Sequence, residues 1–243
     1  MTSSDGRKAA VVLGASGSVG GALIAQLIRS RRFDPIVTLV RRARPEQVAL
    51  ARDAGVELRE VLVPDMDPAN LDAATSEAIR SLEGEVVGLS VLGVGAGTAK
   101  LTLDEHRAID VRLNAAFAQG LKASGRVQHL AFMSAAGADS TAKATGSGAA
   151  GMARYARVKG EAEEAVKASG PAVVSIFRPA MIIGSQHTPW LLEKVLPLFS
   201  FVTPDKFKSI TVDQIAQAMI ATSLSPPQTS SVYNFPEMIA LNP

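Results

Sequence analysis

The chain has 243 residues, of which 47% are hydrophobic, and this is enough for a single α/β domain with a sizeable core. Its 25 basic and 23 acidic side chains nearly balance, so the formal charge of +2 indicates neither a nucleic-acid nor a membrane partner. Cysteine is absent, which excludes disulfides, thiolate metal sites and cysteine nucleophiles and fits a reducing, cytoplasmic location. We also expect no membrane span, no secretory signal in the polar first ten residues, and no metal site among the three scattered histidines.

Short β-branched segments alternate with longer segments of helical periodicity, a pattern that predicts βαβ units on a mostly parallel, doubly wound sheet. Several of the short segments are apolar without alternation, as is typical of strands covered on both faces. The expected strands are residues 9–13, 36–40, 56–63, 86–92, 129–133, 173–177 and 232–234. The expected helices are residues 20–30, 45–54, 68–82, 103–124, 153–169 and 212–223.

Two stretches depart from this alternation. Residues 135–155 are rich in Ala, Gly, Ser and Thr without an apolar period, so we expect a flexible loop there. After Arg178 the chain holds several prolines and its only tryptophan, and residues 184–211 are expected to form a small substrate cap over the sheet. His187, Trp190, Leu191 and Phe199 are candidate substrate contacts there, although solvent exposure for the histidine and core packing for the others are the more ordinary alternatives.

Three glycines at a spacing of three, Gly14, Gly17 and Gly20, separate the first expected strand from the first expected helix. Glycines let a backbone turn sharply and approach a pyrophosphate, and the following helix N-terminus attracts anions. A tight strand-to-helix turn without a ligand is the structural alternative. The position of the three glycines in the first βα turn favours a dinucleotide site.

Arginines follow the second expected strand, in "VTLVRRARPEQ", where an NAD site carries an acidic residue. A guanidinium binds a 2′-phosphate through paired, charge-assisted hydrogen bonds, whereas a carboxylate repels it. The sequence therefore predicts NADP, with Arg41 as the first choice and Arg42 as the second. A solvated basic loop at a helix start is the alternative.

The ends of the third and fourth expected strands supply further candidates. In "LVPDMDP", Asp65 is predicted to contact adenine beside Met66, while Asp67 before Pro68 is suited to cap a helix. In "SVLGVGAG", residues 92–94 would pass beneath the ribose and nicotinamide.

A serine, a tyrosine and a lysine follow in an order that suggests acid–base chemistry. Ser134 stands at the carboxyl end of an expected strand, where its hydroxyl could orient a reacting oxygen. Tyr155 and Lys159 are four residues apart, so they share one face of a helix, and the ammonium favours the phenolate. Tyr155 is thus a candidate proton donor to a carbonyl during hydride transfer. A helix-surface pair is the alternative for these two residues.

With these motifs in this order, the chain resembles the extended or atypical branch of the short-chain dehydrogenase/reductase superfamily. Within that branch, "LGASGSVGG", "VKGEAE" and "FRPAMIIG" resemble the small group of tat-interacting-protein-like oxidoreductases. The resemblance implies one Rossmann-type domain over residues 1–243, NADP(H) as cofactor, a small-molecule substrate, and Ser134, Tyr155 and Lys159 as the catalytic set. It also implies cofactor contacts near residues 180–182, and a homodimer as the alternative to a monomer. The complete set of expected cofactor-binding residues is Gly14, Ser16, Gly17, Ser18, Val19, Gly20, Arg41, Arg42, Asp65, Met66, Leu92, Gly93, Val94, Lys159, Pro179, Ala180 and Ile182.

The sequence departs from the family where an asparagine usually completes the proton relay. Asp110 stands near that place and Asn114 follows one turn later, which puts the relay in doubt. Two functions therefore stay open at this stage. One is an NADP(H)-dependent oxidoreductase that transfers hydride to or from a small carbonyl or activated alkene, and the other is a non-catalytic NADP(H)-binding redox sensor or regulator.

Overall fold

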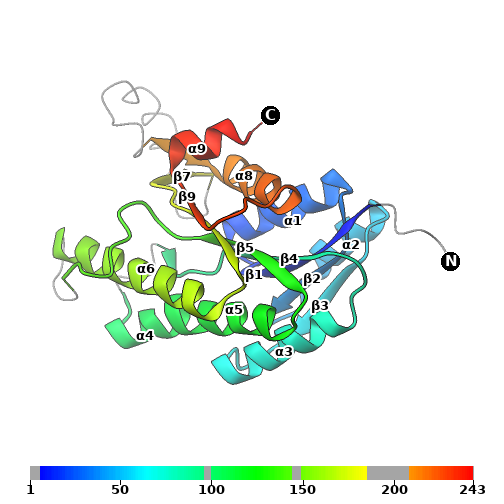
Figure 1. Cartoon of the computed structure of the whole chain (residues 1–243), viewed down its shortest axis with the longest axis horizontal. Helices are drawn as coiled ribbons and strands as arrows, with labels where there is room; N and C mark the ends of the chain where they lie inside the picture. The colour runs from blue at the N-terminus through cyan, green and yellow to red at the C-terminus, as the bar shows by residue number, and fades with distance from the viewer. Residues whose placement is uncertain (1–5, 96–99, 144–148, 185–207, 243) are drawn as a thin grey trace.

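The computed structural model describes residues 6–95, 100–143, 149–184 and 208–242. Seven parallel strands form a central sheet in the order β3-β2-β1-β4-β5-β6-β9 (Figure 1). This order confirms the predicted doubly wound α/β architecture, with the reversal of strand order between β1 and β4. The strands are β1 Lys8–Leu13, β2 Phe33–Val40, β3 Leu58–Leu62, β4 Val86–Ser90, β5 Val127–Met133, β6 Val173–Phe177 and β9 Ser231–Tyr233.

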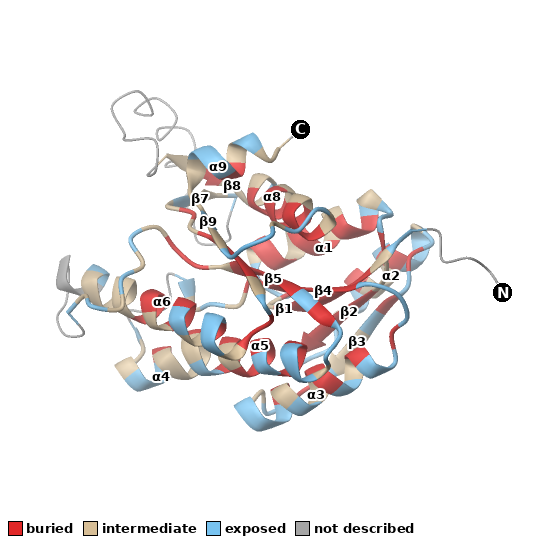
Figure 2. Ribbon diagram, in the orientation of Figure 1, coloured by how far each residue is buried: buried red, intermediate tan, exposed pale blue. Residues whose placement is uncertain are grey.

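Helices cover both faces of the sheet, and most of the central strands are buried (Figure 2). In β1, Ala10 and Val12 face one hydrophobic cluster, whereas Val11 and Leu13 face the other, as the alternation of a strand requires. The first cluster is completed by helices α1 Ser18–Ser30, α2 Pro45–Asp53 and α8 Val212–Leu224. The second is completed by α3 Pro68–Arg80, α5 Asn114–Ala123 and α6 Ala149–Ser169.

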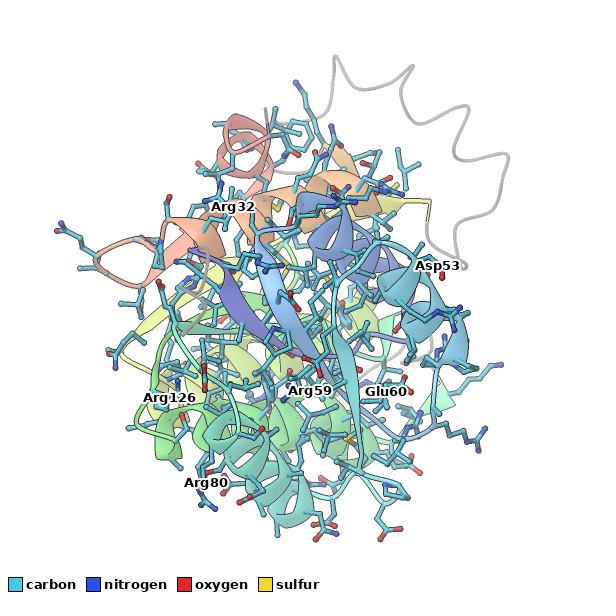
Figure 3. The ribbon with its side chains drawn as sticks, turned by 90° about the vertical axis from the view of Figure 1, so that its right-hand side faces the viewer. Arg32, Asp53, Arg59, Glu60, Arg80 and Arg126 are labelled. Atoms are coloured by element: carbon cyan, nitrogen blue, oxygen red, sulfur yellow. The ribbon has the colours of Figure 1, made fainter. Side chains whose placement is uncertain are left out.

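The strand β3 forms one edge of the sheet and carries charged side chains, which discourages pairing with another chain. Figure 3 views this edge, with Arg59 and Glu60 on opposite sides of β3. Arg59 forms an ion pair with Glu57, its Nε lying 2.7 Å from Oε1. Glu60 instead accepts the backbone N–H of Arg44 at 2.8 Å, and so connects the edge strand to the arginine segment after β2.

Several expected boundaries are wrong. The helix expected over residues 103–124 consists of α4 Leu103–Arg107, a π-helix η2 Ala108–Leu113, and α5. The flexible loop expected over residues 135–155 is wrong from Ala149, where α6 already begins. Asp139 and Ser140 also lie against that helix, because Gly160 has no side chain to hold them away and Asp139 donates its N–H to the Ala156 carbonyl.

The region expected to form a cap, residues 184–211, follows β7 Met181–Ile183 and ends in β8 Ser209–Thr211. These two strands pair in a second, two-stranded sheet. Residues 185–207, with His187, Trp190, Leu191 and Phe199, lie outside the described residues. A short helix, α9 Phe235–Ala240, follows β9 and was not expected. Within the described ranges, no helix has the length and apolar character needed to cross a membrane.

Candidate functional site

The loop between β1 and α1 uses its three glycines for different purposes. Gly14 has a φ of +91°, and a Cβ there would lie 2.6 Å from the backbone nitrogen of Leu92. Gly20 is packed against the backbone of Gly14 and Ala15, so a Cβ would collide with the Gly14 carbonyl. Gly17, the N-cap of α1, is exposed and a Cβ would meet only the Gly14 carbonyl at 3.7 Å. Gly14 and Gly20 therefore shape the loop, while Gly17 leaves space above the helix N-terminus.

A cavity of about 890 Å³ lies beside this loop, at the carboxyl ends of β1, β2 and β3. One wall is the glycine loop, and the opposite walls are the residues after β2, the residues after β3 and the π-helix η2. Arg41 and Arg42 line the cavity and are exposed. The members of the predicted cofactor set that line it are Gly14, Ser16, Arg41, Arg42, Asp65, Met66 and Leu92.

Arg44 is a cavity residue that was not included in the predicted cofactor set. Its guanidinium donates to the Ser16 carbonyl at 3.3 Å, and its Nε lies 3.2 Å from Glu46. Gln47, one turn of α2 further on, donates to the Ala15 carbonyl at 2.9 Å. The start of α2 therefore ties the arginine segment to the glycine loop.

The two aspartates in the turn after β3 have different surroundings. Asp67 caps α3, because its Oδ1 accepts the N–H groups of Ala69 and Asn70 at 3.0 and 3.1 Å. Asp65 is exposed on the cavity wall. Met66 between them has a φ of +46°, a left-handed conformation that is uncommon outside glycine.

The segment after β4 is held by side chains of the helices that follow it. Strand β4 ends at Ser90, two residues before the expected end at Leu92, so all of residues 92–94 lie beyond it. Asn114 donates to the Leu92 carbonyl at 3.3 Å and accepts from the Ser90 hydroxyl at 2.5 Å. Val94 donates its N–H to Oδ1 of Asp110 at 2.9 Å.

Tyr155 and Lys159 lie on one face of α6, as predicted, with the lysine Nζ 5.7 Å from the centre of the tyrosine ring. Tyr155 is half-buried, whereas Lys159 is only 2% exposed. Ser134 follows β5 directly, and its buried Oγ has no hydrogen-bond partner among the described residues. A buried hydroxyl without a partner can still accept or donate a hydrogen bond to a ligand.

Lys159 forms a buried ion pair with Asp110, whose Oδ2 lies 2.8 Å from the lysine Nζ. Burial on its own would raise the pKa of Asp110, but Lys159 and His106 lower this pKa to about 2. For Lys159, burial acts to lower the pKa, and the neighbouring Tyr155 and Asp110 together raise it. The aspartate is thus ionised and the lysine protonated at neutral pH.

His106, one of the three histidines from which no metal site was expected, is a buried member of this group. Its ring stacks on that of Tyr155 at 5.9 Å between centres, and its Nε2 lies 3.5 Å from Asp110 Oδ2. The four-residue spacing of His106 and Asp110 was a signal that could have identified the pair.

The remaining expected residues lie away from the cavity. Pro179 accepts the N–H of Ala136, and Ile182 pairs with Ile210 in the small sheet. Of the described residues, neither these two nor Ala180, Ser134, Tyr155 and Lys159 line the cavity. Gly17, Ser18, Val19 and Gly20, at the start of α1, and Val94 are also absent from the cavity lining. The structure therefore brings only part of the expected nucleotide set together around the cavity. Tyr155, Lys159 and Gly93 form another group, where a Cβ on Gly93 would lie 2.9 Å from Lys159 Nζ. No group of metal-ligating side chains occurs in the described part of the chain.

A model of the NAD(P)H-binding family matches residues 14–226. The fold is similar to that of a short-chain dehydrogenase/reductase from Serratia marcescens, at 17% identity and a TM-score of 0.63, over 96% of this chain and 98% of that one. It is also similar to Gre2 from Candida albicans in complex with NADPH, at 13% identity and a TM-score of 0.65, over 94% and 78% of the two chains. It is similar as well to WbmF from Bordetella bronchiseptica in complex with NAD⁺, at 13% identity and a TM-score of 0.57, over 97% of this chain and 77% of that one.

No curated protein has a sequence that matches this chain. The narrower resemblance to the tat-interacting-protein-like group is not tested by these matches and stays a prediction. One structural neighbour holds NADPH and another holds NAD⁺, so these similarities do not distinguish between the two cofactors.

Proposed function

This chain belongs to the NAD(P)H-binding family, and from that premise we propose that it is an NADP(H)-dependent oxidoreductase of the short-chain dehydrogenase type. The observation that carries the proposal is the cavity in which the glycine loop faces Arg41 and Arg42. When bound, NADPH supplies a hydride, and the substrate is a small carbonyl compound or activated alkene.

The preference for NADP rests on the charges around the nucleotide end of the cavity. Arg41 and Arg42 are exposed on its wall, and the described structure contains no hydrogen bond or ion pair that occupies them. Both guanidinium groups are therefore free to bind a 2′-phosphate in a bidentate manner. Asp65, which lines the same cavity, is assigned to the adenine amino group, to which a carboxylate can only act as acceptor.

The acid–base step is assigned to Tyr155, which donates its hydroxyl proton to the substrate oxygen as the hydride arrives. Ser134 Oγ, buried without a partner, donates a hydrogen bond that steadies that oxygen. The Lys159 ammonium stabilises the negative charge left on Tyr155.

A second function, an NADP(H)-binding regulator without turnover, is favoured by one observation. The Lys159 ammonium is already engaged by Asp110 at 2.8 Å, so part of the positive charge beside Tyr155 is neutralised. Such a regulator would need the glycine loop and the arginines to bind NADP(H), but it would not need Tyr155 as a proton donor.

Cofactor choice is tested by titrating NADPH and NADH into the protein and following fluorescence. We expect NADPH to bind more tightly, and replacement of both Arg41 and Arg42 by alanine to weaken NADPH by about 10- to 100-fold while NADH changes little. Arg52→Ala is the matched control, because Arg52 carries the same charge on α2, contacts Asp53 and does not line the cavity. Equal affinities for NADPH and NADH in the native protein would overturn the preference for NADP.

Turnover is tested by screening aldehydes, ketones and quinones for oxidation of NADPH. Tyr155→Phe should reduce turnover by about 10²- to 10⁴-fold, the usual contribution of a general acid. Tyr233→Phe is the control, because the chain has only two tyrosines and Tyr233 stacks on Phe177 at 4.9 Å, within the sheet. Tight NADPH binding without turnover would favour the regulator, and turnover that survives Tyr155→Phe would remove that residue from the mechanism.

A further inference from the structure

The carboxylate of Asp110 contacts two separate parts of the candidate site with its two oxygens. Oδ2 lies 2.8 Å from the Nζ of Lys159 on α6, and Oδ1 accepts the N–H of Val94, after β4, at 2.9 Å. Asp110 is completely buried and Lys159 nearly so. One side chain therefore links the lysine beside Tyr155 to the segment that follows β4.

A buried ion pair of this kind is a weak source of stability. Removing two charges from water costs several kcal/mol per ion before their attraction is counted, so well-packed apolar residues serve a fold about equally well. The carboxylate also faces His106, whose two ring nitrogens have no hydrogen-bond partner among the described residues. Stability alone therefore does not account for this buried charged group.

The backbone around Asp110 is arranged to aim this carboxylate. The residue lies in the π-helix η2, and π-helical turns inside helices often occur at functional sites. Asn114, immediately after η2, donates to the carbonyls of Asp110 and Leu92 at 2.9 and 3.3 Å. The segment after β4 is thus held at the Leu92 carbonyl by Asn114 and at the Val94 N–H by Asp110.

Gly93, between these two anchor points, is exposed and lies over the ion pair. A Cβ on Gly93 would lie 2.9 Å from Lys159 Nζ and 3.4 Å from Asp110 Oδ2, so the exposed backbone rests directly on the buried charges. On the other side of this segment, Leu92 lines the cavity beside the glycine loop. The segment at residues 92–94 therefore runs from the cavity to Lys159.

We propose that Asp110 is a positioning residue that fixes residues 92–94 and Lys159 as one rigid seat for the nicotinamide–ribose half of the dinucleotide. This inference rests on the proposed function, since it requires NADPH to bind. The adenosine half, which the arginines and Asp65 would hold, is independent of this seat. Asp110 should therefore affect the binding of the nicotinamide–ribose half of the ligand and not the binding of the adenosine half.

The test compares two ligands, NADPH and adenosine 2′,5′-bisphosphate, which lacks the nicotinamide half. Asp110→Asn keeps the size of the side chain and an oxygen for Val94, but removes the charge that holds Lys159. We expect this variant to bind NADPH about tenfold more weakly, the effect of losing one charged hydrogen bond, with unchanged affinity for the bisphosphate. Asp72→Asn is the matched control, because Asp72 contacts Gln119 at the surface. This variant should bind both ligands as tightly as the native protein does.

The possible outcomes separate the inference from the function on which it rests. If the native protein binds neither ligand, the proposed function and the inference both fail. If the native protein binds both ligands and Asp110→Asn binds NADPH equally well, only the inference fails. If Asp110→Asn loses affinity equally for both ligands, the inference is also overturned, because that result indicates general damage to the fold.

Hydrogen exchange on the native chain provides a second test that does not depend on folding of the variant. If the seat exists before the cofactor binds, the amide of Val94 should exchange slowly in the cofactor-free protein, with little further slowing when NADPH is added. Rapid exchange of this amide until NADPH is added would show that the cofactor, and not Asp110, orders the segment.

Discussion

Gly17 differs from its neighbours in the first loop because a methyl group at its Cα would meet only one backbone oxygen, at 3.7 Å. Its φ of −78° is also available to any residue. Gly14 and Gly20 have no such freedom, since the first has a positive φ and both are pressed against backbone. The fold therefore accounts for two of the three glycines, whereas a need for glycine at position 17 would come only from the proposed dinucleotide.

Alanine substitutions separate these roles. Gly17→Ala should leave the free energy of unfolding within about 0.5 kcal/mol of the native value, as expected for an exposed position without strain. It should nevertheless weaken NADPH binding by about tenfold or more, because the methyl group occupies the space above the helix N-terminus. Urea unfolding and an NADPH titration measure the two effects.

Gly20→Ala is the reverse case. Its methyl group would collide with the carbonyl of Gly14, so we expect a loss of about 2 kcal/mol or more in the free energy of unfolding. If Gly17→Ala instead unfolds the protein and binds NADPH normally when folded, the open space at Gly17 has no role in binding.

At the scale of elements, α6 is held to the sheet by a second charged contact besides the Lys159–Asp110 ion pair. Glu163, 4% exposed, accepts two hydrogen bonds from the guanidinium of Arg178, at 2.8 and 2.6 Å. Arg178 directly follows β6 and also donates its backbone N–H to Tyr233 in β9. The pair thus joins α6, β6 and β9 at the carboxyl ends of the strands, the side of the sheet on which the candidate site lies.

Glu163→Gln should lower the free energy of unfolding by about 2 to 4 kcal/mol, because it leaves a half-buried guanidinium without its counter-charge. Glu164→Gln, at the exposed neighbouring position where the carboxylate contacts Ser140, is the control and should cost less than about 1 kcal/mol. Equal effects of the two substitutions in urea unfolding would show that the buried pair is not a special support of α6.

Strand β5 carries a buried histidine that makes the stability of the sheet depend on pH. Burial and the nearby Lys8 lower the pKa of His129 to about 4, and its Nε2 lies 2.9 Å from Ser175 Oγ on β6. Because the unfolded chain binds the proton at a pKa near 6.5, the folded state loses stability as the pH falls from about 6.5 towards 4. We expect a loss of about 2 kcal/mol between pH 7 and pH 5 in urea unfolding, most of which His129→Gln should abolish.

The sequence predicts elements well where local pattern decides them and less well where distant contacts do. The strands β1 to β6 were expected at nearly the observed positions, because their apolar runs and the flanking Gly and Pro residues are local signals. The π-helix at Asp110 was not expected, and the ion-pair partner of Asp110 is Lys159, 49 positions later, which no local pattern connects to it. Likewise, the strands β7 and β8 have three residues each and exist only because they pair across a long interval.

At the scale of the whole molecule, parallel strand direction brings distant residues to one edge. The candidate nucleotide residues follow β1, β2 and β3, and the candidate acid–base residues follow β5 or lie on α6. The strand order reverses between β1 and β4, so residues 92–94 after β4 lie at the boundary between the two groups. A dinucleotide that spans this boundary would contact both halves of the sheet.

Such a ligand should stabilise the entire domain, because it binds the folded state and not the unfolded chain. At a concentration of NADPH about 100 times its Kd, the expected stabilisation is about 2.7 kcal/mol. For a chain of this size, that free energy corresponds to a rise in Tm of about 5 to 10 °C. At the same concentration, NADH should raise the Tm less, since it lacks the 2′-phosphate that Arg41 and Arg42 would bind.

The protein in which Arg41 and Arg42 are both alanine provides the control for this thermal shift. Its own Tm without ligand should be close to the native value, because both side chains are exposed and lie on a loop. Its Tm should respond equally to NADPH and NADH, because the difference between the two ligands is the phosphate alone. A variant that keeps the larger response to NADPH would place the 2′-phosphate elsewhere, and Arg44, which reaches the Ser16 carbonyl from the same cavity wall, would be the next residue to replace.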